Sequence, residues 1–412
     1  MTTLVESGLD VVHVREWGTT TIRCSAEVAA QIHADGHASI APTHENSTYM
    51  LKAKHKVGVL RYGTLELRIT PKVPVSRLLY LASYNDAPAD WKQLDTLLDD
   101  IADPLSAIAE ALAHFAERAL RPTPLQGYVV HEEAERRLRG RVLFDRQLSA
   151  RAGLTMPIEL RFDEYELGII ENRVLKAALM VVEQAVADHH PALRRRLTHL
   201  RFQLDGVEPW TRGLQVPEIS FSRMNERYRP ALVLSRLVLG SHSLEFPNQK
   251  HRGTGFLFDM NRIFESFLEA ALRKELERVG GKVRGQDRVY LDEADTVLMK
   301  PDITWWRHGR HCAVIDAKYK RTTSQDYPSA DAYQMLAYCT RLGLRRGWLV
   351  YADSGAGANG TTIVRGPGTE IMVRALNIAG TIEQIEGGAA ELAREIAEDR
   401  SYGLGTARDG CR

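Results

Sequence analysis

Two aspartates and a lysine in the last third of the chain have the types and the spacing needed to hydrolyse a phosphodiester bond. Asp302 follows a proline and precedes the apolar run 303–306, and Asp316-Ala317-Lys318 follows a second apolar run, 312–315. Such hydrolysis needs a divalent ion to neutralise charge on the phosphate oxygens, and Mg²⁺ usually takes one or two protein carboxylates, with waters as its other ligands. The two aspartates can supply these carboxylates from neighbouring strands.

The lysine belongs to the same predicted site, because side chains at i and i+2 of a strand point to the same face. Lys318 therefore projects beside Asp316, where its ammonium could orient or help to deprotonate the attacking water. Taken singly, each residue is better explained by structure, since an Asp-x-Lys triplet is common and a Pro-Asp step is often a capped turn. Their combination in a strand–turn–strand context favours catalysis.

Two further polar side chains are predicted to lie near this motif. A helix predicted from Phe256 to about Val279 places Glu265 on or beside an apolar stripe. An unpaired carboxylate there would be costly, and a nearby metal ion or lysine would remove that cost. Gln334, on a helix predicted over 329–342, is placed to support the site or to contact the substrate. The alternatives are a half-buried ion pair for Glu265 and an ordinary surface position for Gln334.

Basic residues gather in three places, and a glycine-rich segment needs a separate interpretation. The basic groups lie at 136–146, at 194–196 and around the predicted site at 307–321, where phosphate contacts would position a DNA backbone. The alternative for each group is a solvated face. Residues 355–360 match G-x-G-x-x-G, but a β-branched run follows them instead of the helix that a dinucleotide fold requires. We interpret this segment as a flexible hairpin loop.

Composition limits the class of protein. The 412 residues carry 54 Lys and Arg against 53 Asp and Glu, so that any DNA affinity must be local or come from a partner. The four cysteines form no CxxC pair, which argues against a zinc site or a disulfide framework and fits a reducing cytoplasm. The N-terminus lacks the pattern of a signal peptide, and no apolar run approaches 18 residues, so no membrane span is expected.

The elements around the motif predict four segments. Residues 1–122 form an α+β domain that begins with strands, among them a hairpin over 57–69, and ends with helices at 75–84 and 92–120, the latter broken near Pro104. Residues 123–245 form a mixed, largely helical region with helices near 171–187 and 229–240. Residues 246–380 form an α/β domain with a mixed sheet flanked by helices. Residues 381–412 form a last helix, near 382–398, and a tail.

Taken together, these segments resemble the McrC family, the nuclease subunit of McrBC-type modification-dependent restriction systems. The resemblance runs in order from about residue 10 to 375, and two segments make it specific. They are Asn172-Arg173-Val174-Leu175-Lys176 and Met260-Asn261-Arg262-Ile263-Phe264-Glu265. Further similar stretches lie at 67–73, 138–142, 301–302, 316–320 and 333–338.

The resemblance implies a PD-(D/E)xK endonuclease domain that uses Mg²⁺. Asp302 and Asp316 would be metal ligands, with the backbone carbonyl of Ala317 as a third, Lys318 would orient the water, and Glu265 would be the helix acid. A McrB-like AAA+ GTPase hexamer would be the partner that recognises modified DNA, and the N-terminal domain would contact it. Two alternatives remain open: a non-cleaving adaptor that stimulates the partner's nucleotide hydrolysis, and a stand-alone nuclease of the same fold.

Overall fold

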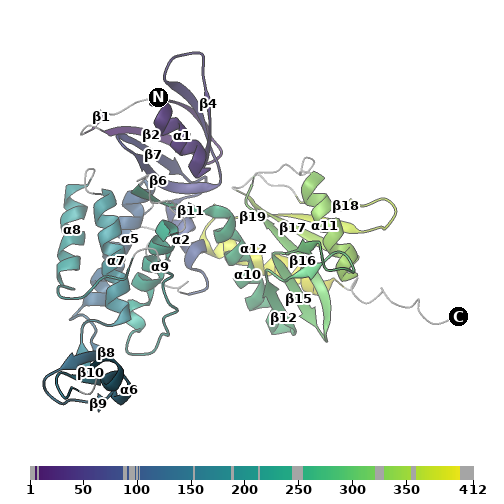
Figure 1. Ribbon diagram of the computed structural model, residues 1–412. Helices are drawn as coiled ribbons and strands as arrows, with labels where there is room; N and C mark the ends of the chain where they lie inside the picture. The colour runs from purple at the N-terminus through teal and green to yellow at the C-terminus, as the bar shows by residue number, and fades with distance from the viewer. Residues whose placement is uncertain are drawn as a thin grey trace. The chain divides into compact units, whose positions relative to one another are not determined.

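A computed structural model of the chain describes residues 5–6, 9–86, 91, 98, 101, 103–151, 154–186, 190–211, 214–243, 254–320, 329–353 and 359–399. The backbone contacts divide the chain into two compact units (Figure 1). Residues 1–107 and 248–412 form the first unit, and residues 108–247 form the second. The sequence-based boundaries near 122, 245 and 380 stay predictions, because grouping by contacts does not test where separately folding domains begin.

The first unit contains a five-stranded sheet in the order β1-β2-β7-β6-β11. Strands β6 (Lys56–Tyr62) and β7 (Leu65–Thr70) form the predicted hairpin, and β2 (Leu9–Arg15) pairs in parallel with β7. A smaller sheet, β3-β5-β4, and a short helix, α1, lie beside these strands, and both sheets share one apolar core. The bounds are β1 Val5–Glu6, β3 Thr19–Arg23, α1 Ala26–Asp35, β4 Ala38–Pro42, β5 Thr48–Ala53 and α2 Val75–Ser83.

The last strand of the five-stranded sheet corrects a prediction. The helix expected from Phe256 begins only at Met260, and the preceding segment is strand β11 (Thr254–Asp259), which pairs antiparallel with β6. Helix α10 (Met260–Leu276) starts directly after Asp259. The Asp259 side chain caps the helix by accepting hydrogen bonds from the backbone N–H groups of Asn261 and Arg262. Leu257 and Phe258 are consecutive and both buried. A short continuous apolar run of this kind fits a buried strand and a buried helix equally well, so its pattern could not decide between them.

The second unit is built on helices with a small sheet beside them. The predicted helices are confirmed as α7 (Ile170–Val186) and α9 (Arg229–Ser243), and α5 (Pro104–Leu120) starts at the predicted break, while most of 92–102 lies outside the described residues. Helix α8 (Pro191–Phe202) was not predicted, because its charged residues hide a short apolar stripe. The remaining elements are β8 Gly127–Glu135, β9 Arg141–Val142, α6 Phe144–Arg151, β10 Ile158–Glu166 and η1 Glu226–Tyr228.

The expected mixed sheet flanked by helices is confirmed in the last part of the first unit. Its order is β12-β15-β16-β17-β19-β18, with β16, β17 and β19 parallel and the other pairs antiparallel. Helix α11 packs on one face through Val314, Leu349 and Tyr351, whereas Val350, which points to the other face, meets α12. The bounds are η2 Glu277–Val279, β12 Lys282–Gly285, β13 Val289–Tyr290, β14 Leu298–Met299, β15 Ile303–Arg307, β16 Arg310–Lys318, α11 Ser329–Leu342, β17 Arg346–Asp353, β18 Gly360–Ile363, β19 Glu370–Asn377 and α12 Ile382–Glu398.

Strand β19, which was not predicted, overturns one interpretation. It lies between β17 and β18, so these two strands are not hydrogen-bonded neighbours and the glycine-rich segment between them is not a hairpin loop. The β-branched run after that segment is the predicted strand, β18. Residues 354–358 themselves lie outside the described part of the chain.

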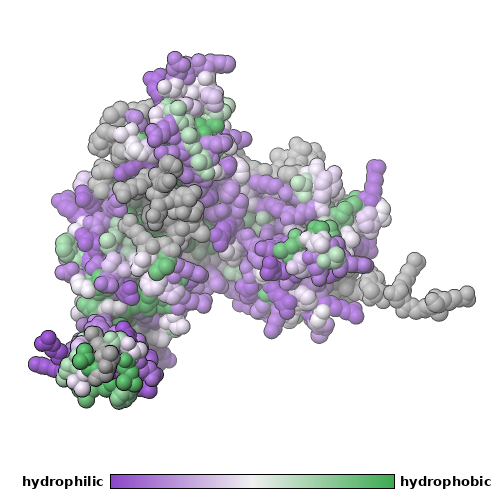
Figure 2. Space-filling view, viewed as in Figure 1, coloured by the Kyte–Doolittle hydropathy of each residue, from purple (hydrophilic) through white to green (hydrophobic). Residues whose placement is uncertain are grey.

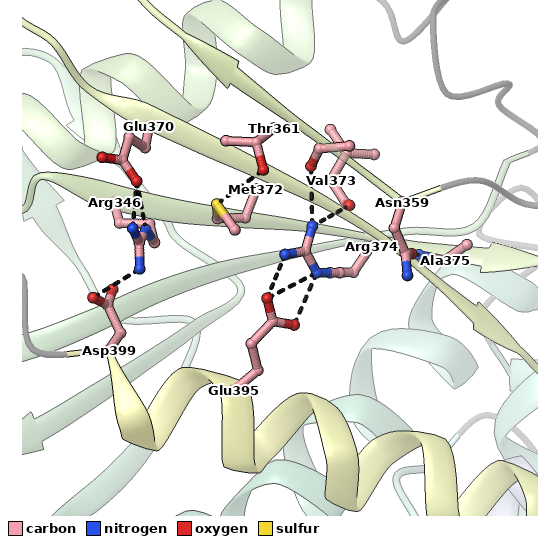
Figure 3. A network of polar contacts seen from close by, with 11 residues as sticks. Arg346, Asn359, Thr361, Glu370, Met372, Val373, Arg374, Ala375, Glu395 and Asp399 are labelled. Carbon is pink, nitrogen blue, oxygen red and sulfur yellow. Dashed lines mark hydrogen bonds and ion pairs between the residues drawn. The ribbon is translucent and has the colours of Figure 1, made fainter.

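Helix α12 is fixed to the sheet by arginines on two strands (Figure 3). The guanidinium of Arg374 on β19 pairs with both carboxylate oxygens of Glu395, and also donates to the carbonyl of Gly360 at 3.0 Å. Arg346 on β17 links Glu370 to Asp399, just beyond the helix, with an Nη1–Oδ1 distance of 2.9 Å to the latter. These ion pairs stabilise the end of the sheet opposite β12.

No helix in the described ranges is both long enough and apolar enough to span a bilayer.

Candidate active site

The hairpin of β15 and β16 brings the two predicted aspartates together. Asp302 directly precedes β15, whose first residue, Ile303, pairs with Ile315. A carboxylate oxygen of Asp302 accepts a hydrogen bond of 2.8 Å from the backbone N–H of Ala317, the residue after Asp316. The register of one hairpin therefore fixes both acids at the same edge of the site, as the spacing predicted.

Burial and mutual repulsion of these acids change their protonation. Burial, and next the charge of Asp316, raise the pKa of Asp302 to about 8. Asp316 is 1% exposed, and burial raises its pKa although the neighbouring Lys318 acts in the opposite direction. Burial acts to lower the pKa of Lys318, but the charge and hydrogen bond of Asp316 and the charges of Asp331 and Asp302 together outweigh it, so that the pKa is raised and the lysine stays an ammonium. The site thus holds more acid than its single lysine can neutralise.

Lys318 is held by groups on two sides. Its ammonium forms an ion pair with Asp316 and donates to the side-chain oxygen of Gln334 on α11 at 3.0 Å. The Gln334 amide nitrogen donates to the Tyr338 hydroxyl at 2.8 Å, and that hydroxyl donates to the carbonyl of Lys300 at 3.2 Å. The structure therefore places Gln334 at the site, where it orients the lysine, and adds Tyr338 behind it.

Glu265 reaches the site through a residue that the sequence reasoning missed. The side-chain amide of Gln286 donates to Glu265 and lies 3.4 Å from Oδ1 of Asp302, and its backbone N–H donates to the carbonyl of Asp302 at 2.9 Å. Gln286 adopts a φ of 50°, which is unusual for a residue with a side chain. Burial raises the pKa of Glu265 against the effect of the Gln286 hydrogen bond. No local signal in the sequence marks this glutamine, since neither its φ nor its partners follow from its neighbours.

The donor set fits a hydrated Mg²⁺ better than a metal held by many side chains. Within the described ranges, no group of three or more His, Cys, Asp or Glu side chains is arranged to hold a metal ion. Asp302 and Asp316 remain as two adjacent buried carboxylates with an excess of negative charge, and Mg²⁺ commonly binds through one or two carboxylates with several waters. The role of the Ala317 carbonyl as a third ligand stays a prediction.

Three arginines of the first two basic groups are ion-paired. Arg139 contacts Glu135 and Glu164, Arg146 contacts Glu132 and Glu159, and Arg196 contacts Glu110 and Glu117. For these three residues the pairs favour the interpretation as a solvated face. In the group around the site, Lys320 is paired with Asp331, whereas Arg310 is exposed at the tip of the hairpin. Asp302 and Asp316 lie at the other end of these two strands, so the structure does not place Arg310 beside them.

Comparisons with known proteins identify the family of the chain. A family model described as McrBC 5-methylcytosine restriction system component matches residues 51–352. A refined half-complex from a tetradecameric assembly of Thermococcus gammatolerans McrB AAA+ hexamers with bound McrC contains a similar chain. The TM-score is 0.60 at 18% identity, over 94% of this chain and 100% of that chain. A cryo-EM structure of the Thermococcus gammatolerans McrBC complex also contains a similar chain. Its TM-score is 0.41 at 20% identity, over 65% of this chain and 88% of that chain. No curated protein is similar enough to count as a match.

Proposed function

Because the chain belongs to the family of McrBC 5-methylcytosine restriction system components, we propose that it is the DNA-cleaving subunit of a GTP-dependent restriction complex. Its last sheet would be a PD-(D/E)xK endonuclease domain. The observation that supports this most directly is the convergence of Asp302, Asp316 and Lys318 on one hairpin, with Gln334 bonded to the lysine. Two buried acids with one ammonium are an unfavourable arrangement unless a cation completes it.

The residues have separate roles in this proposal. Asp302 and Asp316 would hold Mg²⁺, which would supply neutralisation of the charge on the phosphate. Lys318, fixed between Asp316 and Gln334, would orient the attacking water, and its raised pKa keeps it a hydrogen-bond donor. Glu265, tied to Asp302 through Gln286, would be the helix acid beside this metal site.

The partner in this proposal is an AAA+ GTPase hexamer like the one named in the similar structure. Besides the N-terminal domain, which the family resemblance implies as a contact, the chain offers a surface for it on the small sheet β8-β10-β9 and helix α6, where hydrophobic side chains gather (Figure 2). Phe144 is 71% exposed and Tyr128 is 77% exposed, and exposed apolar patches of this kind mark interaction sites. The other exposed apolar residues of this surface are Val130, Leu138, Leu148, Leu154, Met156 and Tyr165.

The test is cleavage of methylated and unmethylated plasmid with Mg²⁺ and GTP, by the chain with and without its AAA+ partner. Asp316→Ala and Lys318→Ala should each abolish cutting while stimulation of GTP hydrolysis persists. Glu293→Gln, which removes an exposed acid on the β13–β14 hairpin, is the matched control and should cut like the wild type.

Each other outcome points to a different function. Cutting by the chain alone would identify a stand-alone nuclease. Stimulated GTP hydrolysis without any cutting would identify an adaptor. Cutting that survives Asp316→Ala would refute the assignment of the site.

A further inference from the structure

Tyr319, the residue directly after Lys318, connects two elements of the proposed active site. It is 2% exposed at the end of β16. Its ring lies 6.3 Å, centroid to centroid, from that of Phe264, the residue that precedes Glu265 on α10. A shift of Tyr319 would therefore move the lysine through the backbone and the helix acid through packing.

The Tyr319 hydroxyl is fixed by the N-terminal part of the chain. It donates a hydrogen bond of 2.8 Å to Oε1 of Glu16, which follows β2 in the five-stranded sheet. The same oxygen accepts the backbone N–H of Lys72 at 2.7 Å. Glu16 is 6% exposed, and in the described part of the chain its Oε2 has no hydrogen-bond partner. A buried carboxylate with one unsatisfied oxygen is costly to keep.

Lys72 encloses the tyrosine from the other side. Its ammonium lies 4.0 Å from the centre of the Tyr319 ring and donates to the carbonyl of Ala352 at 3.1 Å. Ala352 belongs to β17, the strand next to β16. The segment 67–73, one of those that resemble the McrC family, thus ends in a residue that contacts the catalytic sheet.

We propose that Glu16, Lys72 and Tyr319 are positioning residues that fix the end of β16 and the start of α10, so that the N-terminal sheet sets the geometry of the cutting site. This inference rests on the proposed nuclease function. Glu16 and Tyr319 lie 303 residues apart, and the buried, partly unsatisfied carboxylate contributes less to stability than an apolar contact of the same size would. A role in orientation explains such a group.

The first variant is Tyr319→Phe, which removes one hydroxyl and keeps the ring. In the full chain with its AAA+ partner, the single-turnover rate of plasmid cleavage should fall about 10- to 100-fold, as expected for a misplacement of catalytic groups by a fraction of an ångström. The DNA concentration for half-maximal rate and the stimulation of GTP hydrolysis should stay unchanged.

Tyr80→Phe is the matched control. The Tyr80 hydroxyl donates to Glu386 at 2.9 Å, which also joins the N-terminal part to the C-terminal part, but neither α2 nor α12 holds a site residue. Loss of this hydrogen bond should leave the cleavage rate within about twofold of the wild type.

Substitutions of Glu16 test orientation against mere stability. Glu16→Gln keeps an oxygen that can accept both hydrogen bonds, so it should retain most of the wild-type cleavage rate. Glu16→Ala should lose at least as much of that rate as Tyr319→Phe does. The double variant, Glu16→Ala with Tyr319→Phe, should be no slower than Glu16→Ala alone, because that substitution already removes the hydrogen bond from Tyr319 together with the one from Lys72.

Three results would overturn the inference. Tyr319→Phe could cut at the wild-type rate, or Tyr80→Phe could lose as much of the cleavage rate as Tyr319→Phe does. In the third, the fold-loss of rate in the double variant would equal the product of the fold-losses in the two single variants. If the wild type itself does not cut, the proposed function fails first, and this inference fails with it.

Discussion

The folding stability of the metal-free protein should fall less with rising pH in Asp302→Asn than in the wild type. Burial and the charge of Asp316 hold the pKa of Asp302 at about 8 in the folded state, well above the value of about 3.9 for an unperturbed aspartate. A group whose pKa is raised by folding stabilises the fold fully below the unfolded value, and that contribution is lost as the pH rises through the folded value. The wild type should therefore lose stability as the pH rises from about 4 to about 8.

The structure sets an upper limit on the size of this effect. At about 1.4 kcal/mol per pKa unit, the difference corresponds to at most about 6 kcal/mol, and the coupling to Asp316 and the partial exposure of Asp302 reduce it to a few kcal/mol. Asparagine resembles the protonated acid, so Asp302→Asn should keep the stability of the low-pH state at high pH.

The assay is thermal unfolding with EDTA at pH 5.5, 7.0 and 8.5. The melting temperature of the wild type should fall across this range by several degrees more than that of Asp302→Asn, and Mg²⁺ should restore the wild type at pH 8.5 only. Asp292→Asn is the control, because hydrogen bonds from Thr296 and Val297 lower the pKa of Asp292 to about 2, outside the window. Parallel curves for Asp302→Asn and the wild type would refute the electrostatic account of the site.

Two further predictions concern the glutamine and the apolar surface. Gln286→Gly should relieve an unfavourable φ of 50° and so leave the melting temperature unchanged or higher. Loss of the side-chain amide should raise the Mg²⁺ concentration needed for half-maximal cleavage several-fold. An unchanged Mg²⁺ titration would contradict the role of Gln286. Phe144→Ser should lower stimulation of the partner's GTP hydrolysis at least tenfold without changing the melting temperature, because its side chain is 71% exposed; Leu298→Ser, exposed on the β13–β14 hairpin, should keep full stimulation.

Local pattern predicted the part of the site that one hairpin positions. Two apolar runs on either side of a short turn predicted the hairpin of β15 and β16 that brings Asp302, Asp316 and Lys318 together, and helical spacing predicted Gln334 on α11. These contacts connect residues that are close in sequence or lie on adjacent elements. For such residues, spacing along the chain is sufficient to predict which side chains meet.

The remaining features depend on long-range pairing. Strand β11 is a strand because β6, some 200 residues earlier, hydrogen-bonds to it, and its own residues fit either structure. Gln286 acquires its role through a left-handed backbone conformation, and Tyr319 through Glu16 at a separation of 303 residues. Neither is encoded in a local pattern that could be read without the fold.

The pairing of β11 with β6 has a consequence for how the protein is made. The N-terminal sheet receives its last strand only after the whole of 108–247 has left the ribosome, so that its fifth strand and the helix with Glu265 become ordered together. Until then β6 has one unpaired edge, a site for wrong pairing between chains. A fragment begun at residue 246 would keep β11 but lack β6, so that the strand directly before α10 would have no sheet to join.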